Sequence, residues 1–345
     1  MKKVGTLTFN RAINYGAILQ ALALKEKVGA YTETEIINYA QPHIESVYSY
    51  KDNKIKEFIR CIFFGKRDEK FRKVINEVSS QERYEKSDLE QVNYEKIIVG
   101  SDQVWNYGCT ENDESFLLPN IETKKYSYAA SFGVSRLPEK HVEFFREQLS
   151  KFRYISVREK TGQNICKEQL GLSAEIVLDP TLLLTKEDWR ELLNVQSNNK
   201  KYILFYAFGN NKNLLAVAKR VSKLTGFPIY NISVRINDFF GNKVIKSAGP
   251  KDWVELLYNA AFVVTDSFHA TAFSINFNKP FYSFSYNKRA SRITDLLDML
   301  GLQDRFNPAL EDINLSMEAD YNFINNKLEE ERKKSLVFIE KIIND

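Results

Sequence analysis

The sequence has few cysteines and no long hydrophobic run. Three of its 345 residues are cysteine, and the positions Cys61, Cys109 and Cys166 fit neither a metal site nor a redox pair. This odd, scattered set argues against a secreted disulfide scaffold and favours a reducing compartment. No apolar run approaches the ~20 residues that span a bilayer, and MKKVGTLTF lacks the apolar core of a signal peptide. We therefore expect a cytoplasmic protein.

Motifs of cofactor, phosphate and metal chemistry are missing as well. The chain contains no G-x-G-x-x-G, no G-x-x-x-x-G-K-S/T, no H-E-x-x-H and no C-x-x-C. A dinucleotide cofactor, P-loop phosphoryl transfer and a zinc centre therefore lack their signatures, and we expect neither a cofactor nor a metal. The formal net charge is only +4, without a long tract of one sign, so the sequence does not predict a nucleic-acid partner.

One region is distinctly basic. From Lys51 to Lys73, nine Lys or Arg residues stand against four Asp or Glu, around the apolar residues Ile62, Phe63 and Phe64. Such a region suits a peripheral surface that contacts anionic lipid at the inner face of a membrane. It also suits a solvated helix face, and both interpretations stay open.

Short apolar runs alternate with helical patterns along nearly the whole chain. The runs are VGTLTF, IINY, KIIVG, KYSYAA, YISV, EIVL, YILFYAF, PIYNI, FVVTDS and PFYSF. Because they are apolar throughout, they fit strands covered by helices on both faces, which is typical of a parallel sheet. One helix is predicted to begin at Asn14 and to stop at Gly29, and another to end at Gly226.

The length predicts two domains, because single cores rarely grow beyond ~250–300 residues. The polar segment QSNNK separates the two sets of strands and is expected to be the linker. We place an N-terminal α/β domain at 1–195, a C-terminal α/β domain at 200–312 and a closing helix within 313–345. The predicted architecture is α/β, with two doubly wound, Rossmann-like domains facing a cleft.

Polar side chains recur directly after the predicted strands. They are Ser101, Asp102, Ser131, Arg158, Asp179, Thr265, Asp266, Ser267, His269, Lys288, Arg289 and Arg292. Neighbouring strands lie about 4.8 Å apart, so groups past their carboxyl ends share one rim, where such sheets bind ligands.

The stretch VVTDSFHATAFSI is a strand that runs into a helix near Phe268. Free N–H groups and the positive end of the helix dipole would face an anion above Ser267 and His269. The dipole disfavours imidazolium, so a neutral His269 would be able to take or relay a proton. Alternatively, Asp266 or Ser267 only caps the helix, and His269 satisfies a buried carbonyl.

Three arginines are candidates for binding the anion. Arg289 and Arg292 stand at a helix start, where cations need an anionic partner, or else they belong to a solvated basic turn. Arg158 has the fork geometry for a carboxylate or phosphate, and it also has the option of pairing with Glu159 or another surface acid.

Acidic and aromatic residues of the first half have two interpretations each. Asp102 follows Gly100 and is either a base and acceptor for sugar hydroxyls or a helix cap. Asp179 precedes Pro180, and Asp-Pro starts turns by itself. Trp105 either stacks on a sugar ring or fills the core.

Seven sequence blocks occur together in a known order. They are NYGAILQALAL, IIVGSDQVWN, YAASFG, ISVREK, VLDPTLLL, VVTDSFHATAFSI, and NKPFYSF followed by RITDLLDMLGL. In order and spacing, from residue 4 to about 305, the chain resembles the polysaccharide pyruvyl transferase family. The resemblance implies a glycosyltransferase-B-like fold and transfer of pyruvate from phosphoenolpyruvate onto two sugar hydroxyls as a cyclic ketal, with release of phosphate.

The resemblance also implies roles for residues. His269 matches the family's histidine and Arg158 its arginine, and the donor would lie against the second domain. We expect His269, Arg158 and Asp102 to be catalytic. Substrate contacts are expected from Ser267, Asp266, Lys288, Arg289, Arg292, Asn14, Tyr15, Ser131 and Asp179.

Two positions depart from the family's pattern. Ser267 stands where many members have Arg, and Ala270 stands where many have Gly. We expect Lys288, Arg289 or Arg292 to supply the missing phosphate contact.

The expected partners are phosphoenolpyruvate and a sugar or lipid-linked oligosaccharide of a capsule or exopolysaccharide. Two alternatives stay open: a nucleotide-sugar-dependent glycosyltransferase of the same fold, and a catalytically silent glycan-binding protein.

Overall fold

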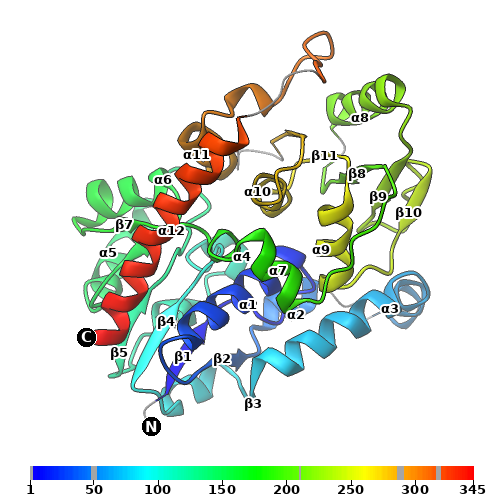
Figure 1. Ribbon diagram of the computed structural model, residues 1–345. Coiled ribbons are helices and arrows are strands. Elements are labelled where there is room, and N and C mark those ends of the chain that lie inside the picture. The colour runs from blue at the N-terminus through cyan, green and yellow to red at the C-terminus, as the bar shows by residue number, and fades with distance from the viewer. Residues whose placement is uncertain (1–2, 48–52, 210, 286–290, 316–319) are drawn as a thin grey trace. The chain divides into compact units, whose positions relative to one another are not determined.

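A computed structural model describes residues 3–47, 53–209, 211–285, 291–315 and 320–345. They form two compact units, each built around a five-stranded parallel sheet (Figure 1). The first unit contains residues 1–57, 72–183 and 330–345, and the second contains 58–71 and 184–329. The predicted α/β class with parallel sheets is confirmed.

The sheet of the first unit has the strand order β3-β2-β1-β4-β5. Its strands are β1 (Val4–Leu7), β2 (Thr34–Tyr39), β3 (Ser79–Tyr84), β4 (Lys96–Val99) and β5 (Lys124–Ser127). Two parallel bridges, Tyr126 to Tyr154 and Ala130 to Val157, continue the pairing to β6 (Ser156–Val157), which pairs with β7 (Glu175–Ile176). The helices in this part of the sequence are α1 (Tyr15–Gly29), α2 (Pro42–Val47), α3 (Lys54–Val78), α4 (Tyr107–Thr110), α5 (Glu139–Leu149), α6 (Lys160–Asn164) and the short η4 (Pro180–Leu182).

The sheet of the second unit has the order β10-β9-β8-β11-β12. Its strands are β8 (Ile203–Tyr206), β9 (Ile229–Ile232), β10 (Lys243–Ile245), β11 (Phe262–Thr265) and β12 (Phe281–Ser283). The helices are α7 (Lys186–Leu192), α8 (Lys212–Thr225), α9 (Pro250–Asn259), α10 (Phe268–Asn276), α11 (Ser291–Leu300) and α12 (Tyr321–Asn344), whose last residues belong to the first unit. Among the described helices, none has the length and apolar content needed to cross a membrane.

Both sheets reverse their strand order in the middle. The reversal lies between β1 and β4 in the first unit and between β8 and β11 in the second. At such a point the connections leave toward opposite faces and open a crevice at the carboxyl ends of the two strands. Each unit therefore offers one preferred place for polar side chains that bind ligands.

Alternation along β8 explains how the second sheet is covered on both faces. Ile203 and Phe205 belong to the core cluster that contains Leu214 of α8. Tyr206, on the opposite face, packs edge-on against Trp253 of α9, with ring centroids 5.7 Å apart. Because successive strand residues point to opposite faces, one apolar run serves both helix layers.

The helix ends follow the local sequence. The side chain of Asn14 accepts a hydrogen bond from the N–H of Ala17 at 3.3 Å, and α1 extends to Gly29 as predicted. Gly226 ends α8 with a φ of +73°, a conformation that glycine adopts without strain.

The boundary between the units differs from the predicted linker. Residues 58–71, inside the predicted N-terminal domain, already belong to the second unit, and the chain enters that unit again at Leu184, before α7, and not at residues 196–200. The reason is that α7 packs on α10: the ring centroids of Trp189 in α7 and Phe273 in α10 are 5.0 Å apart. The amide of Asn276 also donates to the carbonyl of Leu184 at 2.8 Å.

The predicted closing helix exists, but its end returns to the first unit. Ser335 accepts a hydrogen bond from the N–H of Leu178 at 2.9 Å, and Lys96 donates to the carbonyl of Ile342 at 3.1 Å. Residues 330–345 therefore belong to the same compact unit as β1 and β4.

Candidate functional site

The loop after β4 is held in an unusual backbone conformation. Gly100 and Asp102 have φ values of +120° and +69°. A Cβ on Gly100 would lie 2.3 Å from the carbonyl oxygen of Tyr128, so only glycine fits there. The N–H of Ser101 donates to the amide oxygen of Gln20 at 3.0 Å, and Thr8 donates to the carbonyl of Ser101 at 3.0 Å. Contacts from α1 and from the residue that follows β1 therefore fix the position of this loop.

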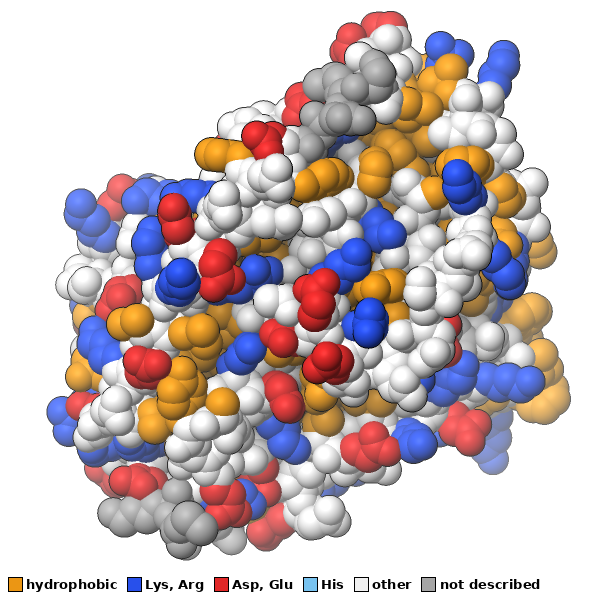
Figure 2. All heavy atoms as spheres, in the orientation of Figure 1, with side chains coloured by type: hydrophobic (Ala, Val, Ile, Leu, Met, Phe, Trp, Pro, Cys, Tyr) orange, Lys and Arg blue, Asp and Glu red, His pale blue; other side chains and the backbone are white. Residues whose placement is uncertain are grey.

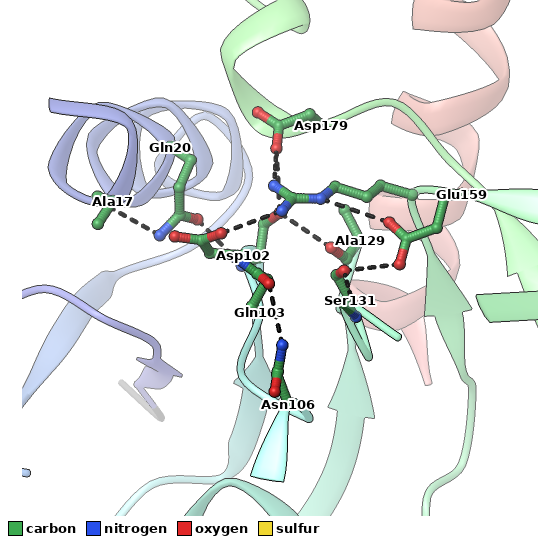
Figure 3. A network of polar contacts seen from close by, with 12 residues as sticks. Ala17, Gln20, Asp102, Gln103, Asn106, Ala129, Ser131, Glu159 and Asp179 are labelled. Carbon is green, nitrogen blue, oxygen red and sulfur yellow. Dashed lines mark hydrogen bonds and ion pairs between the residues drawn. The ribbon is translucent and has the colours of Figure 1, made fainter. Parts of the chain in front are cut away.

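Arg158 contacts three carboxylates of a buried polar cluster in the first unit. We call Arg158 with Asp102, Ser131, Glu159 and Asp179 the Arg158 cluster, and Figure 3 shows the last four side chains gathered around one guanidinium. The guanidinium of Arg158 donates from Nη1 to Asp179 Oδ2 at 2.5 Å and from Nη2 to Asp102 Oδ1 at 3.0 Å. Its Nε lies 3.5 Å from Glu159 Oε2. Only 1% of the Arg158 side chain is exposed, so the arginine pairs with acids inside the protein and not at its surface.

Ser131 and Glu159 extend the cluster along the rim. Ser131 donates its hydroxyl proton to Glu159 Oε1 at 2.6 Å and accepts from the N–H of Gly133 at 3.1 Å. Its own N–H donates to the carbonyl of Asp102 at 2.9 Å. Ser131 is fully buried, so its contacts position the neighbouring carboxylates.

Asp179 combines the two roles that the sequence left open. Its Oδ1 accepts from the N–H of Thr181 at 3.0 Å, which starts the turn η4. Its Oδ2 faces Arg158 and lies 3.4 Å from the Ser101 hydroxyl. The turn interpretation is therefore correct, and the same carboxylate belongs to the rim.

The charges of the Arg158 cluster do not balance. One guanidinium faces three carboxylates, which gives these four groups a formal charge of −2 when all are ionised. Burial lowers the pKa of Arg158, but the carboxylates of Asp179, Asp102 and Glu159 raise it further, so the net change is upward. The arginine stays charged, and the cluster favours hydroxyl donors over an anionic ligand.

Other first-half candidates lie at the start of α1 or in the core. Asn14 is half-buried and caps α1, and Tyr15 is buried. Trp105 is buried against Phe132, at 5.1 Å between ring centroids, and its indole N–H donates to the carbonyl of Phe116 at 3.2 Å. The core interpretation of Trp105 is therefore correct.

Asp266 joins the two central strands of the second unit at their carboxyl ends. It accepts hydrogen bonds from the N–H groups of Phe208 at 2.8 Å and Gly209 at 2.9 Å, just past β8. Burial raises the pKa of Asp266, while these hydrogen bonds and the charge of Arg235 lower it by less. Asp266 therefore shapes the crevice between β8 and β11.

Ser267 and His269 begin α10 beside that crevice. Ser267 is the N-cap, and its hydroxyl accepts from the N–H of Ala270 at 3.4 Å. His269 lies in the first turn with 7% of its surface exposed, and its ring meets Phe268 edge-on at 5.1 Å. Ser267 therefore caps α10, and its contact with a substrate and the chemical role of His269 stay predictions.

The basic candidates near α10 are placed only in part. The guanidinium carbon of Arg292 lies 5.7 Å from the ring centroid of Phe268, so this arginine is close to the start of α10. Lys288 and Arg289 lie outside the described residues. Arg235, which the sequence reasoning missed, follows β9 and acts electrostatically on Asp266. Its place three residues after the strand run PIYNI is the signal that identifies it.

Two further residues escaped notice as site residues. Gln20 is a buried amide within the apolar face of α1, and Glu159 follows Arg158 directly after β6. Gln20 could have been identified from the sequence as a lone polar residue on the apolar face of a predicted helix. Within the described residues, no group of three or more His, Cys, Asp or Glu is arranged to hold a metal ion.

Several solved structures are similar to this chain at low sequence identity. The UDP-GlcNAc 2-epimerase of Methanocaldococcus jannaschii has a TM-score of 0.50 and 14% identity, covering 100% of this chain and 99% of that one. The UDP-GlcNAc 2-epimerase of Neisseria meningitidis has a TM-score of 0.47 and 11% identity, covering 100% and 94%. The Escherichia coli heptosyltransferase WaaC has a TM-score of 0.40 and 13% identity, covering 83% and 91%.

At this identity the first similarity concerns the fold alone, which is the glycosyltransferase-B-like pair of Rossmann-like domains. A comparison with curated proteins finds no match. The polysaccharide pyruvyl transferase profile matches residues 14–288, a range that includes the Arg158 cluster and the residues Asp266, Ser267 and His269. This chain belongs to the polysaccharide pyruvyl transferase family.

Proposed function

We propose that this protein transfers pyruvate from phosphoenolpyruvate to two hydroxyls of a glycan sugar, forms a cyclic ketal and releases phosphate. The family match supports a transferase of polysaccharide synthesis. The observation that carries the proposal is the start of α10, where Ser267 caps a helix at a strand-order reversal and His269 occupies the first turn. No added cofactor is proposed, because phosphoenolpyruvate itself is the donor substrate.

The donor suits the second unit. Phosphoenolpyruvate carries a carboxylate and a phosphate, and free N–H groups of a helix N-terminus favour such anions. Arg292, near the same helix start, adds positive charge. We propose Lys288 and Arg289, two residues of the adjacent basic segment, as further phosphate contacts.

In the proposed reaction two sugar hydroxyls add to one carbon of phosphoenolpyruvate and phosphate leaves it. His269 donates a proton to the methylene carbon, which becomes a methyl group and leaves an electrophilic carbon. A sugar hydroxyl attacks this carbon and gives its proton to Asp102, and phosphate leaves with the electrons of its C–O bond. A second hydroxyl then attacks the same carbon, closes the ring and returns a proton to His269. A positioned acid or base contributes about 10²–10⁴-fold to such a step.

The acceptor suits the Arg158 cluster. Its excess of carboxylates offers acceptors for sugar hydroxyls, and 11% of the Asp102 side chain is exposed. We propose that Asp102 accepts a proton from an attacking hydroxyl and that Arg158 positions this carboxylate. Asn14 and Tyr15, at the start of α1, are proposed to line the acceptor side.

A coupled phosphate-release assay tests the proposal. Purified protein is mixed with phosphoenolpyruvate and a panel of galactose- and mannosamine-terminated glycans. We expect phosphate release that depends on one glycan of the panel. The mass of that glycan should increase by about 70 Da, because the ketal adds a net C₃H₂O₂. Release without any glycan, or none with the whole panel, would count against it.

Two other functions are distinguished by binding. A rise in melting temperature with uridine or cytidine nucleotides, but not with phosphoenolpyruvate, would favour a nucleotide-sugar donor. Glycan binding without turnover, unchanged in His269→Gln, would favour a silent binding protein. We further propose that the acceptor is part of a lipid-linked capsule or exopolysaccharide unit, which would place the enzyme at the inner face of a membrane.

A further inference from the structure

The first half of α3 presents apolar side chains to solvent. Ile55, Phe58, Ile59, Ile62 and Phe63 are between 39% and 74% exposed. Their spacing of three and four residues puts them on one face of the helix, which we call the α3 stripe. Exposed apolar residues are normal when scattered, but a contiguous stripe of five marks an interaction surface.

The α3 stripe is not the face that packs within the protein. That inner face contains Phe64 and Phe71, which are buried, and the buried ion pair of Arg60 with Asp68. The helix is therefore apolar on two faces, and only one of them has a structural role in the described chain. Past Phe63 the outer face changes to exposed charged residues, which include Lys66, Glu69 and Lys73.

Basic side chains surround the α3 stripe. Lys54, Lys56 and Lys66 are exposed along the same helix. The ammonium of Lys246 lies 4.8 Å from the ring centroid of Phe63 and 5.5 Å from that of Phe239, which is 82% exposed. Figure 2 shows hydrophobic and basic side chains next to each other over the right-hand end of α3.

We infer that the α3 stripe docks on an anionic lipid surface. A helix with apolar residues in a row and lysines beside them lies in the plane of the interface, with the apolar face at the boundary of headgroups and acyl chains. The lysines then meet lipid phosphates. Lys246 and Phe239 extend the contact beyond the helix.

Charge argues for lipid over a second copy of the chain. In a two-fold symmetric dimer each surface patch meets its own copy. Lys54, Lys56 and Lys66 of one protomer would then approach the same lysines of the other, and like charges across an interface are unfavourable. An anionic surface satisfies both the apolar and the basic groups.

Vesicle sedimentation tests the inference with the full chain. Wild type is expected to bind vesicles of phosphatidylglycerol and phosphatidylcholine, and to bind pure phosphatidylcholine at least about tenfold less. The variant Ile55→Gln/Phe58→Gln/Ile62→Gln is expected to lose at least about tenfold of the anionic binding. The variant Lys54→Gln/Lys56→Gln/Lys66→Gln is expected to show a similar loss and a weaker dependence on salt.

A matched control removes apolar area elsewhere. Phe323 and Val337 on α12 are 55% and 62% exposed, and Phe323→Gln/Val337→Gln is expected to bind like wild type. Equal binding of wild type and Ile55→Gln/Phe58→Gln/Ile62→Gln to the anionic vesicles would overturn the inference. The inference would also be overturned if ultracentrifugation showed that wild type is a dimer and Ile55→Gln/Phe58→Gln/Ile62→Gln a monomer, because a second copy of the chain would then cover the α3 stripe.

This inference is independent of the proposed transfer reaction. Phosphate release on a soluble glycan is expected to be unchanged in Ile55→Gln/Phe58→Gln/Ile62→Gln, because none of these three residues belongs to the Arg158 cluster or lies at the start of α10. Failure of the phosphate-release assay would leave the vesicle result intact, and the reverse holds as well.

Discussion

Arg158 and Asp179 form an ion pair of 2.5 Å in which only 1% of each side chain is exposed. Transfer of the two charges from water into the protein costs on the order of several kcal/mol per ion. Only a close ion pair with further hydrogen bonds offsets this cost. Asp102, Glu159 and Thr181 supply those further contacts. The pair therefore fixes the positions of three loops that follow β4, β6 and β7.

Replacement of Arg158 is expected to destabilise the first unit strongly. In Arg158→Gln, three carboxylates remain close together without a cation, and a loss of about 3–5 kcal/mol in the free energy of unfolding is expected. Chemical denaturation followed by tryptophan fluorescence measures it. Arg136→Gln breaks an exposed pair with Glu139 and should change the free energy by less than about 1 kcal/mol. Similar effects in the two variants would show that the buried cluster is not structural.

Asp266 tests whether a carboxylate is needed between β8 and β11. Asp266→Asn keeps the size but offers one oxygen in place of two, so the N–H of either Phe208 or Gly209 loses its partner. A destabilisation of about 1–3 kcal/mol is expected. Asp298→Asn, on the exposed side of α11, is the control and should stay within about 0.5 kcal/mol. An unchanged Asp266→Asn protein would mean that the loop after β8 needs only one acceptor.

Local sequence patterns predicted four strands of each five-stranded sheet and the rims, but missed the edge strands β3 and β10, which are not apolar runs. Apolar runs such as KIIV and FVVT became buried parallel strands, and polar residues after them met at the carboxyl ends. Asn14 and Gly226 identified helix ends because capping depends on neighbours in the sequence.

Tertiary packing determined what the sequence patterns did not predict. The partners of Arg158 come from loops 56 and 21 residues away in the sequence. No local pattern therefore showed whether its guanidinium is available to a ligand or belongs to a buried ion pair. The unit boundary depends on Trp189 packing against α10, and the return of the chain's end depends on Ser335. For α3 the sequence showed lysines and phenylalanines, but only the structure shows which face is buried.

His269 is expected to be needed for turnover more than for folding. His269→Gln keeps the helix position and hydrogen-bonding capacity, and should lower glycan-dependent phosphate release by about 10²–10⁴-fold. The melting temperature should change by only a few degrees. His141→Gln, at a half-buried histidine of the first unit, is the control and should retain wild-type turnover. Full activity of His269→Gln would remove the proposed acid from the mechanism.

Lys279 links stability to pH in the second unit. Burial, with a smaller effect of Lys186, lowers the pKa of Lys279 from 10.5 to about 8. Both ammonium groups lie over the ring of Tyr258, at 5.1 Å for Lys186 and 5.9 Å for Lys279. Between pH 8 and pH 10.5 the unfolded chain holds a proton that the folded chain has released. Since stability rises with pH where the unfolded state binds more protons, this lysine destabilises the fold most below pH 8.

Lys279→Gln is therefore expected to stabilise the protein near neutral pH and to remove this pH dependence. The gain should be about 1–2 kcal/mol near pH 7, after allowance for partial exposure. It should decrease between pH 8 and pH 10.5 and vanish above this range, because wild-type Lys279 is then neutral in both states. Denaturation curves across this range measure the difference between variant and wild type, and Lys251→Gln at an exposed position of α9 is the control. A difference that stays constant with pH would mean that Lys279 is protonated equally in both states.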